Sequence, residues 1–265
     1  MNQLAETSFT AYVGIDWSDA KHDICLESAD GEAVEFDCIS SRPEAIAAWA
    51  TALHQRFDGP IAVAVELTKG PIVSALAKHD FIEIFPINPL MLARYREAFT
   101  PSRAKDDPSD AQLALDLIRR HPERFQPLKP QRVEMRQLIS LVEQRYKVLC
   151  DQRRTVNRLN HALKSYYPQV LDWFRQHNTV LFCDFLTEWP TLQQLKRARA
   201  SRVARFFTAH NMRRQAVIER RLKAIREAVP LTDDAAVIGP CCLQIEVLIE
   251  QLRVTIDALK RYDDA

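Results

Sequence analysis

The segment "AYVGIDWSDAKHDICLES" (residues 11–28) contains two apolar runs separated by a short polar stretch. Residues 11–18 and 21–28 are each predicted to form a strand, because apolar side chains alternate there as they do in half-buried strands. The turn "ADG" (29–31) leads into a third run, "EAVEFDCIS" (32–40). Three consecutive strands joined by short turns predict an antiparallel meander.

Helices and strands alternate after the meander. Helices are predicted from Pro43, from Pro71 and from about Pro89, because proline is favoured in the first turn of a helix. Between them, the fully apolar "IAVAVEL" (61–67) predicts a central strand covered on both faces, and "FIEIFP" (81–86) predicts a short strand. The resulting order, βββαβαβα, is the order of the ribonuclease H-like α/β fold.

The second half of the chain is predicted to be helical. The stretch "HPERFQPLKPQR" (121–132) has three prolines in twelve residues and is predicted to be a linker. One long helix is expected over 133–165. Shorter helices are expected around 169–187, 191–209 and 212–228. We therefore predict an α/β domain over 1–125 and a basic, all-α, partly coiled-coil region over 126–265.

The last helix is expected to begin at Pro240 and to carry an apolar seam. Its apolar residues recur in steps of three and four, as in a heptad seam of fewer than three heptads: Cys242, Ile245, Ile249, Leu252, Ile256 and Leu259. The sequence leaves two interpretations of this apolar seam open. The seam packs against the 133–165 helix of the same chain, or it joins two copies of the chain.

The net charge of +1 conceals a strong asymmetry along the chain. Residues 1–125 contain 12 Lys and Arg against 20 Asp and Glu, whereas residues 126–230 contain 21 against 8. Residues 231–265 contain 3 against 7. An acidic domain followed by a basic segment predicts that the middle of the chain binds a polyanion.

Carboxylates are placed where elements of the predicted α/β domain end. Asp16 and Glu66 lie at the ends of predicted strands, and "AKDDPSDAQLALDL" (104–117) places Asp107 and Asp110 on one face of a helix that begins there. In the predicted fold these four carboxylates converge, and their mutual repulsion is relieved by a divalent cation. Hard oxygen ligands favour Mg²⁺, with Mn²⁺ as a substitute, and two such ions can promote phosphodiester displacement. Asp106 is interpreted as the helix cap or a supporting group.

Several of these stretches together resemble a known family. "VGIDWSDAKHDICL", "VAVELTKG", "INPLMLARYREAF" and "RAKDDPSDAQLAL" resemble the N-terminal domain of insertion-sequence 110 transposases, a family that includes the Piv-type DNA invertases. That domain is similar to the Holliday-junction resolvase RuvC, and its four acidic residues, the DEDD set, correspond to Asp16, Glu66, Asp107 and Asp110. The usual Lys-Thr-Asp is Lys105-Asp106-Asp107 here. The resemblance covers residues 11–120 and extends more weakly into the helical region.

The resemblance implies a DNA transposase or site-specific recombinase of a mobile element, with metal-dependent phosphodiester chemistry and DNA as partner. Some members of the family are directed by a structured guide RNA, so an RNA partner is implied by resemblance alone. Members of the family continue into a C-terminal domain with a serine thought to attack DNA. This sequence ends at "KRYDDA", before any such segment, so we expect a fragment, a truncated copy or a standalone N-terminal protein.

The basic middle segment supplies the candidate nucleic-acid-binding residues. Phosphate contacts need clustered Lys and Arg, and Tyr166 and Tyr167 could stack on unpaired bases. Solvated helix faces are the competing explanation, since Lys and Arg are ordinary helix formers. The candidates are Arg145, Lys147, Arg153, Arg154, Arg158, Lys164, Lys196, Arg197, Arg199, Arg202, Arg205, Arg213 and Arg214.

Other classes of protein fit the sequence less well. An actin-like or sugar-kinase ATPase needs glycine-rich phosphate loops, and the chain has five glycines and no P-loop. A catalytically inactive nucleic-acid-binding protein is the main alternative, and a ribonuclease H-like nuclease or junction resolvase is the next. The six cysteines have no metal-binding spacing, and the N-terminus has no signal pattern. We expect a cytoplasmic protein that forms a homo-oligomer and does not enter a membrane.

Overall fold

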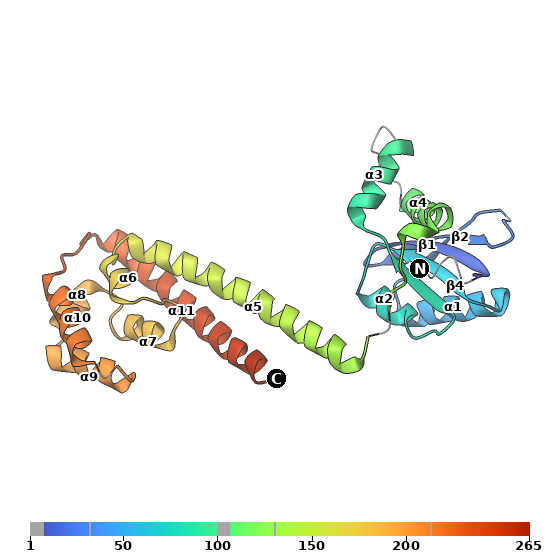
Figure 1. The fold of residues 1–265 in the computed structure, drawn as a ribbon. Helices are drawn as coiled ribbons and strands as arrows, with labels where there is room; N and C mark the ends of the chain where they lie inside the picture. The colour runs from blue at the N-terminus through green and yellow to red at the C-terminus, as the bar shows by residue number, and fades with distance from the viewer. Residues whose placement is uncertain (1–7, 32, 100–106, 130, 213) are drawn as a thin grey trace. The chain divides into compact units, whose positions relative to one another are not determined.

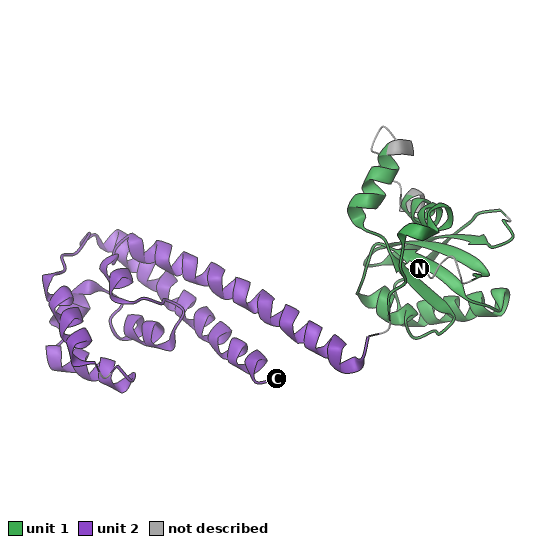
Figure 2. Ribbon diagram, viewed as in Figure 1, with its two compact units in different colours: residues 1–130 green, residues 131–265 purple. Residues whose placement is uncertain are grey.

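The computed structural model describes residues 8–31, 33–99, 107–129, 131–212 and 214–265 (Figure 1). The chain divides into two compact units, residues 1–130 and residues 131–265 (Figure 2). Each unit is described by itself below.

Unit 1 is built around a five-stranded mixed sheet with the order β3-β2-β1-β4-β5. The strands are β1 (Ala11–Trp17), β2 (Lys21–Ser28), β3 (Glu35–Ser40), β4 (Ile61–Val65) and β5 (Ile82–Pro86). The first three strands pair antiparallel, as the meander prediction requires. β4 pairs parallel with both β1 and β5, and all five of its residues are buried. The structure thus confirms that the apolar run forms a central strand.

Helices cover both faces of this sheet (Figure 1). On one face, Val13, Ile15 and Val63 pack in a core with side chains of α1 (Pro43–Phe57) and α2 (Pro71–Leu76). On the other face, Ala62 and Ala64 pack with side chains of α4 (Asp107–Arg120). α3 (Pro89–Phe99) precedes α4, so two helices follow β5.

Gly14 lets α4 lie directly on β1. A Cβ atom added at Gly14 would lie 2.0 Å from the carbonyl oxygen of Ala111 and 2.6 Å from the backbone nitrogen of Leu115. Both are backbone atoms of α4, so no side-chain adjustment can relieve such a clash. The glycine therefore fixes where the first two turns of α4 cross the sheet.

The predicted linker is packed against unit 1 over much of its length. A 3₁₀ turn, η2 (Pro122–Arg124), follows α4, and Phe125 is buried in the core between α4 and the sheet. The backbone N–H of Leu128 donates to the carbonyl oxygen of Ile84 at 2.8 Å. The compact unit accordingly extends to residue 130, five residues beyond the boundary that the sequence predicts.

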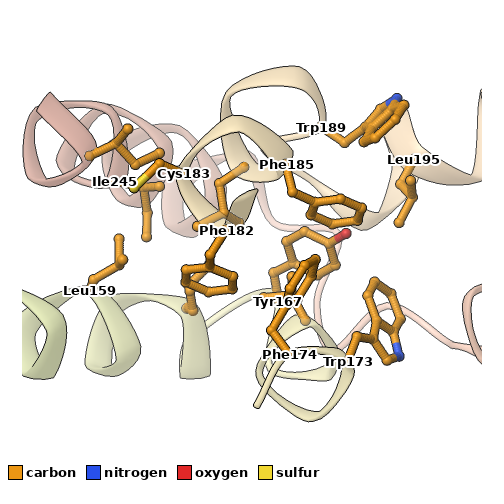
Figure 3. Close-up of a cluster of buried hydrophobic side chains, with 14 of the residues drawn as sticks. Leu159, Tyr167, Trp173, Phe174, Phe182, Cys183, Phe185, Trp189, Leu195 and Ile245 are labelled. Atoms are coloured by element: carbon orange, nitrogen blue, oxygen red, sulfur yellow. The ribbon is translucent and has the colours of Figure 1, made fainter. Parts of the chain in front are cut away.

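Unit 2 is dominated by two long helices, α5 (Val133–Lys164) and α11 (Ala235–Asp263). They run antiparallel, because Arg145 pairs with Asp263 near one end while Leu159 and Ile245 share a core farther along (Figures 1 and 3). Most of the seam of α11, including Ile249 and Leu252, packs in this core. The seam is therefore used within the chain, which is the first of the two interpretations offered for it.

α11 begins earlier than the sequence predicts. Asp234 caps it by accepting a hydrogen bond from the backbone N–H of Ala236 at 2.8 Å, and Pro240 lies inside the helix. By length and apolar composition this one described helix could cross a membrane, whereas the sequence analysis expects a protein that does not enter one. A helix that packs in a protein core passes the same test, and α11 packs on α5.

Shorter helices complete unit 2, and two that were predicted as continuous are interrupted. The Thr179 hydroxyl accepts a hydrogen bond from the backbone N–H of Phe182 at 3.2 Å and starts a new helix inside the predicted 169–187 helix. The predicted 191–209 helix begins at Thr191, whose hydroxyl accepts from the backbone N–H of Gln194 at 3.2 Å, but it is broken between Arg197 and Ala200. The observed helices are α6 (Gln169–Trp173), α7 (Val180–Glu188), α8 (Leu192–Arg197), α9 (Ala200–Ala209) and α10 (Gln215–Glu227).

Aromatic side chains fill the core of unit 2 (Figure 3). Phe174 packs edge to face with Phe182 and Phe185, and the fully buried Tyr167 packs edge to face with Trp173 in the same core. Tyr166 is also buried, and its hydroxyl donates to the carbonyl oxygen of Pro190 at 2.8 Å. The prediction that these two tyrosines stack on unpaired bases is therefore wrong, because both rings are needed to fill the core.

Candidate metal centre and nucleic-acid interface

Asp16 and Glu66 lie at the same edge of the sheet. The parallel ladder between β1 and β4 pairs Ile15 with Val65, and the two carboxylates are the next residues along each chain. Successive side chains of a strand point to opposite faces. Asp16 therefore shares a face with Gly14, which is the face that α4 covers, and Glu66 follows the last residue of β4 at the same edge. Adjacent strands thus bring two of the predicted ligands to one edge.

Asp110 lies in the first turns of α4, immediately before the residue whose carbonyl touches Gly14. Its side chain is 6% exposed and forms an ion pair with Arg96 of α3, whose side chain is 23% exposed. The Arg96 Nε donates to Asp110 Oδ1 at 2.7 Å, and a second guanidinium nitrogen contacts the same oxygen. The buried carboxylate is therefore neutralised by a neighbouring helix.

Two other predicted groups lie partly or wholly outside the described residues. Asp107 is the first residue of α4, but its side chain lies outside the described part of the structure. Asp106, predicted as a cap, lies wholly outside the described residues. The structure accordingly places Asp16 and Asp110 on the α4 side of the sheet, and Glu66 at the same edge as Asp16.

A further carboxylate beside this edge was not predicted from the sequence. Asp23 of β2 is the cross-strand partner of Asp16, and it is 8% exposed. Lys21 pairs with it, Nζ to Oδ1, at 3.2 Å. Directly opposed residues of antiparallel strands have neighbouring side chains on one face. The register of the predicted hairpin, counted back from its turn, is the signal that could have identified Asp23.

An open cavity of about 460 Å³ adjoins Glu66. Its walls are the segment after β4, including Thr68 and Lys69, and the segment after β5, including Asn88. The side-chain oxygen of Asn88 accepts from the backbone N–H of Leu90 at 2.9 Å, which fixes the start of α3 at the cavity rim. Ligands of open α/β sheets bind outside the carboxyl ends of strands, which is where this cavity lies.

The carboxylate oxygens of this site suit a hard divalent cation, but the described carboxylates do not surround one common metal position. Carboxylate oxygens are the ligands that Mg²⁺ and Mn²⁺ prefer. Within the described ranges, no group of three or more His, Cys, Asp or Glu residues could hold a metal ion. One reason is visible, since Asp110 is engaged by Arg96. The chemistry of the residues therefore fits the ion, while Asp110 has another partner.

Cysteine chemistry does not compete with the carboxylates at this site. Cys25 lies under α4, in contact with Ala111 and Leu115, and is fully buried. Burial, aided by the negative charges of Asp116 and Glu27, raises the pKa of the Cys25 thiol to about 12. A thiol with this pKa stays protonated near neutrality and is a poor nucleophile or ligand.

Most of the predicted nucleic-acid-binding residues are exposed. Lys147, Arg154 and Arg158 lie in steps of seven and four along α5, and therefore on one side of that helix. Other exposed members of the predicted set are Arg153, Lys164, Lys196, Arg197, Arg199, Arg202, Arg205 and Arg214. Arg197 and Arg202 border an open cavity of about 430 Å³ beside Trp189. Arg213 lies outside the described residues.

Some basic side chains are already engaged within unit 2. Arg145 is half-buried and pairs with Asp263, Nε to Oδ1, at 2.6 Å. Arg154 pairs with Asp151, and Arg202 pairs with Glu188. Arg221 differs in kind, because its guanidinium lies 4.8 Å from the ring centroid of Phe174 and burial lowers its pKa. It belongs to the core rather than to a surface for phosphates.

Comparison with known proteins identifies relatives over the region that holds both features. Residues 13–168 match a family described as a transposase, the DEDD transposases of the IS110 type. A protein named "Putative transposase y4uE" from Sinorhizobium fredii is 29% identical over 210 residues, which are 77% of this chain and 57% of that protein. The "Mini-circle putative transposase for IS117" from Streptomyces coelicolor is 30% identical over 174 residues, 64% of this chain and 42% of that protein.

These matches have a defined extent. The aligned parts span about half the length of the curated relatives. The family match contains Asp16, Glu66, Asp107 and Asp110 and reaches to the end of α5. Since it covers more than half of the sequence, the chain belongs to the IS110 family of DEDD transposases.

Proposed function

We propose that the chain acts as a DNA transposase or site-specific recombinase, and that it carries out divalent-metal-dependent phosphodiester chemistry on DNA. The observation that carries the proposal is the position of Asp16 and Glu66 at adjacent carboxyl ends of parallel strands, with Asp16 on the face covered by α4. The sheet order β3-β2-β1-β4-β5, with three antiparallel strands followed by parallel ones, supports a ribonuclease H-like, RuvC-like domain.

Each carboxylate has a proposed role. Asp16, Glu66, Asp107 and Asp110 would hold Mg²⁺, or Mn²⁺ in its place, through their oxygens. Two bound divalent ions supply an activated nucleophile and stabilise the leaving oxygen. The sheet edge holds Asp16 and Glu66 on a rigid frame, and the contact of α4 with Gly14 fixes the height of Asp110 above β1. The cavity beside Glu66, with Lys69 and Asn88 in its walls, would receive the DNA strand.

The exposed basic residues of unit 2 would bind the phosphate backbone. The unit from 131 to 265 contains 23 Lys and Arg against 15 Asp and Glu, whereas residues 1–130 contain 13 against 20. This separation favours a division of labour in which the helical unit supplies affinity and the sheet supplies chemistry. A structured guide RNA is part of the proposal through family resemblance, and we place the protein in the cytoplasm.

A second copy of the chain would pair through the first half of α5. This stretch has six exposed large apolar residues: Val133, Met135, Leu138, Ile139, Val142 and Tyr146. Met135, Ile139, Val142 and Tyr146 recur in steps of four, three and four, which is the spacing of a coiled-coil seam. An antiparallel pair would place Ile139 opposite Val142 and Arg136 near Glu143, so the surface is complementary to itself. The proposed assembly is a homo-oligomer.

A nucleic-acid-binding protein without catalytic activity is the second candidate. The Arg96–Asp110 ion pair favours it, because the buried carboxylate is compensated without any metal. Cleavage of junction and linear DNA with Mg²⁺ or Mn²⁺ separates the possibilities: junction cleavage supports a recombinase, digestion of linear ends supports a nuclease, and tight binding without cleavage supports the inactive binder.

Metal binding itself is tested by unfolding experiments on the full chain. We expect Mg²⁺ or Mn²⁺ to raise the unfolding temperature, since a ligand at about 100 times its Kd adds about 2.7 kcal/mol. Asp16→Asn, Glu66→Gln and the pair Asp107→Asn with Asp110→Asn should abolish the shift while leaving DNA affinity in EDTA nearly unchanged. Asp19→Asn, an exposed residue of the adjacent hairpin turn, is the matched control. An equal metal response in all variants would refute the ligand assignment.

A further inference from the structure

The ion pair between Arg96 and Asp110 joins two helices at the candidate metal centre. Asp110 is almost fully buried, and Arg96 is partly buried. Two guanidinium nitrogens of Arg96 contact one oxygen of Asp110, Oδ1. A buried carboxylate without a partner is strongly unfavourable, so this contact stabilises the fold around Asp110.

The same contact opposes cation binding by Asp110. A divalent ion on Oδ1 would have to share an oxygen that already accepts from Arg96, and the two positive charges would repel each other at close range. Asp16 and Glu66 lie on the neighbouring sheet edge, so a cation there would approach the Arg96 guanidinium from the α4 side. Arg96 and a metal ion therefore compete for Asp110.

The position of α3 indicates where the Arg96 side chain would lie once it no longer contacts Asp110. α3 begins at Pro89, and both Pro89 and Asn88 line the cavity that also contains Glu66. Arg96 lies two turns farther along this helix, on the side that reaches α4. A guanidinium fits phosphate through two parallel hydrogen bonds, which a lysine ammonium cannot reproduce.

We propose that Arg96 is a positioning residue that holds Asp110 in the metal-free protein, releases it when a divalent cation binds, and then contacts a DNA phosphate at the same site. The inference rests on the proposed function. It adds an exchange of partners. The metal ion replaces Arg96 at Asp110, and the Arg96 guanidinium then binds a phosphate. Metal and DNA would then bind cooperatively, because the metal ion releases the group that contacts the phosphate.

The first measurement is the affinity of the full chain for Mn²⁺ by isothermal titration calorimetry without DNA. Removing the competing charge in Arg96→Gln should tighten Mn²⁺ binding by about tenfold, the order expected when one close charge is deleted. Arg96→Lys keeps the charge and should bind Mn²⁺ within about twofold of the wild type. Arg94→Gln, an exposed arginine on the same helix, is the matched control and should match the wild type.

The second measurement is the salt dependence of DNA affinity, with Mn²⁺ and with EDTA. With Mn²⁺, Arg96→Gln should flatten the log–log salt slope by about one unit, because one phosphate contact is lost. With EDTA, its slope should equal that of the wild type, since Arg96 is then bound to Asp110. A residue that merely ties α3 to α4 would not make the slope depend on metal in this way.

The outcomes distinguish this inference from the proposed function. If the wild type binds Mn²⁺ but Arg96→Gln binds it no more tightly than Arg94→Gln, the competition is refuted and the metal site stands. If Arg96→Gln unfolds, Arg96→Lys still decides, because a normal Mn²⁺ affinity with a metal-dependent loss of the phosphate contact supports the exchange and an unchanged slope refutes it. If the wild type binds no Mn²⁺, the proposed function and this inference fall together.

Discussion

At the scale of single residues, the candidate site depends on one glycine as much as on its carboxylates. Gly14 is buried under α4, and any side chain there would meet the backbone at Ala111 and Leu115. Asp110 adjoins that contact, and Asp16 lies two residues beyond the glycine on the same face. The approach of helix and strand therefore sets the separation of two predicted ligands.

Gly14→Ala tests this dependence. The added methyl group must push α4 away from β1, so we expect a loss of about 1–3 kcal/mol in the free energy of unfolding, with a weakened metal response. Gly239→Ala is the control, because Gly239 is an exposed helical residue with open space around it. That substitution should stabilise the protein by about 0.5–1 kcal/mol. Equal stabilities of the two variants in chemical denaturation would contradict the packing argument.

Single residues also show what the sequence can and cannot predict. Asp16 and Glu66 could be placed because each ends an apolar strand, a local pattern. Asp23 was missed because its proximity to Asp16 depends on hairpin register. The contact of Arg96 with Asp110 follows from the packing of α3 against α4, which leaves no periodic signal in the sequence.

At the scale of elements, hydrophobic periodicity located the strands and the long helices well. It failed at local breaks and caps: Thr179 starts a new helix inside the predicted 169–187 helix, the predicted 191–209 helix is broken between Arg197 and Ala200, and Asp234 starts α11 before Pro240. Hydrophobic periodicity indicates which face of a helix is buried. A helix cap is a single hydrogen bond at one position, so it leaves no periodic pattern in the sequence. The seam on α11 could be recognised, but the sequence could not decide between its two possible partners, the 133–165 helix of the same chain and a second copy.

The exposed half of α5 yields a prediction at this scale. Ile139→Glu combined with Val142→Glu should disrupt self-association, because charges in an apolar seam are desolvated without partners. Sedimentation velocity should then show a shift from oligomer to monomer. Val229→Glu changes an exposed apolar residue outside the helices and should leave the assembly intact. A wild-type protein that sediments as a monomer, or a double variant that still assembles, would argue against this surface.

At the scale of the whole molecule, charge is divided between the two compact units. The acidic unit holds the candidate metal ligands, and the basic unit holds the exposed arginines and lysines. This division was readable from composition alone, because net charge needs no structure. The sequence could not show which basic side chains are engaged, such as Arg221 over Phe174.

The basic unit is tested by replacing two arginines of α5. Arg154→Ala with Arg158→Ala should weaken DNA affinity and flatten the log–log salt slope by about two units, one for each lost phosphate contact. Lys260→Ala with Arg261→Ala removes the same charge from the exposed end of α11 and serves as the control. An identical slope for the two double variants would exclude this face of α5 as the interface.

The most direct test of the central claim is a crystal structure of the full chain grown with Mn²⁺, with the ion located by anomalous scattering. We predict an anomalous peak bounded by the carboxylates of Asp16, Glu66, Asp107 and Asp110, with metal–oxygen distances near 2.1–2.2 Å, about those of hard divalent ions. A peak elsewhere, or none at saturating Mn²⁺ with Asp110 still paired to Arg96, would contradict the account.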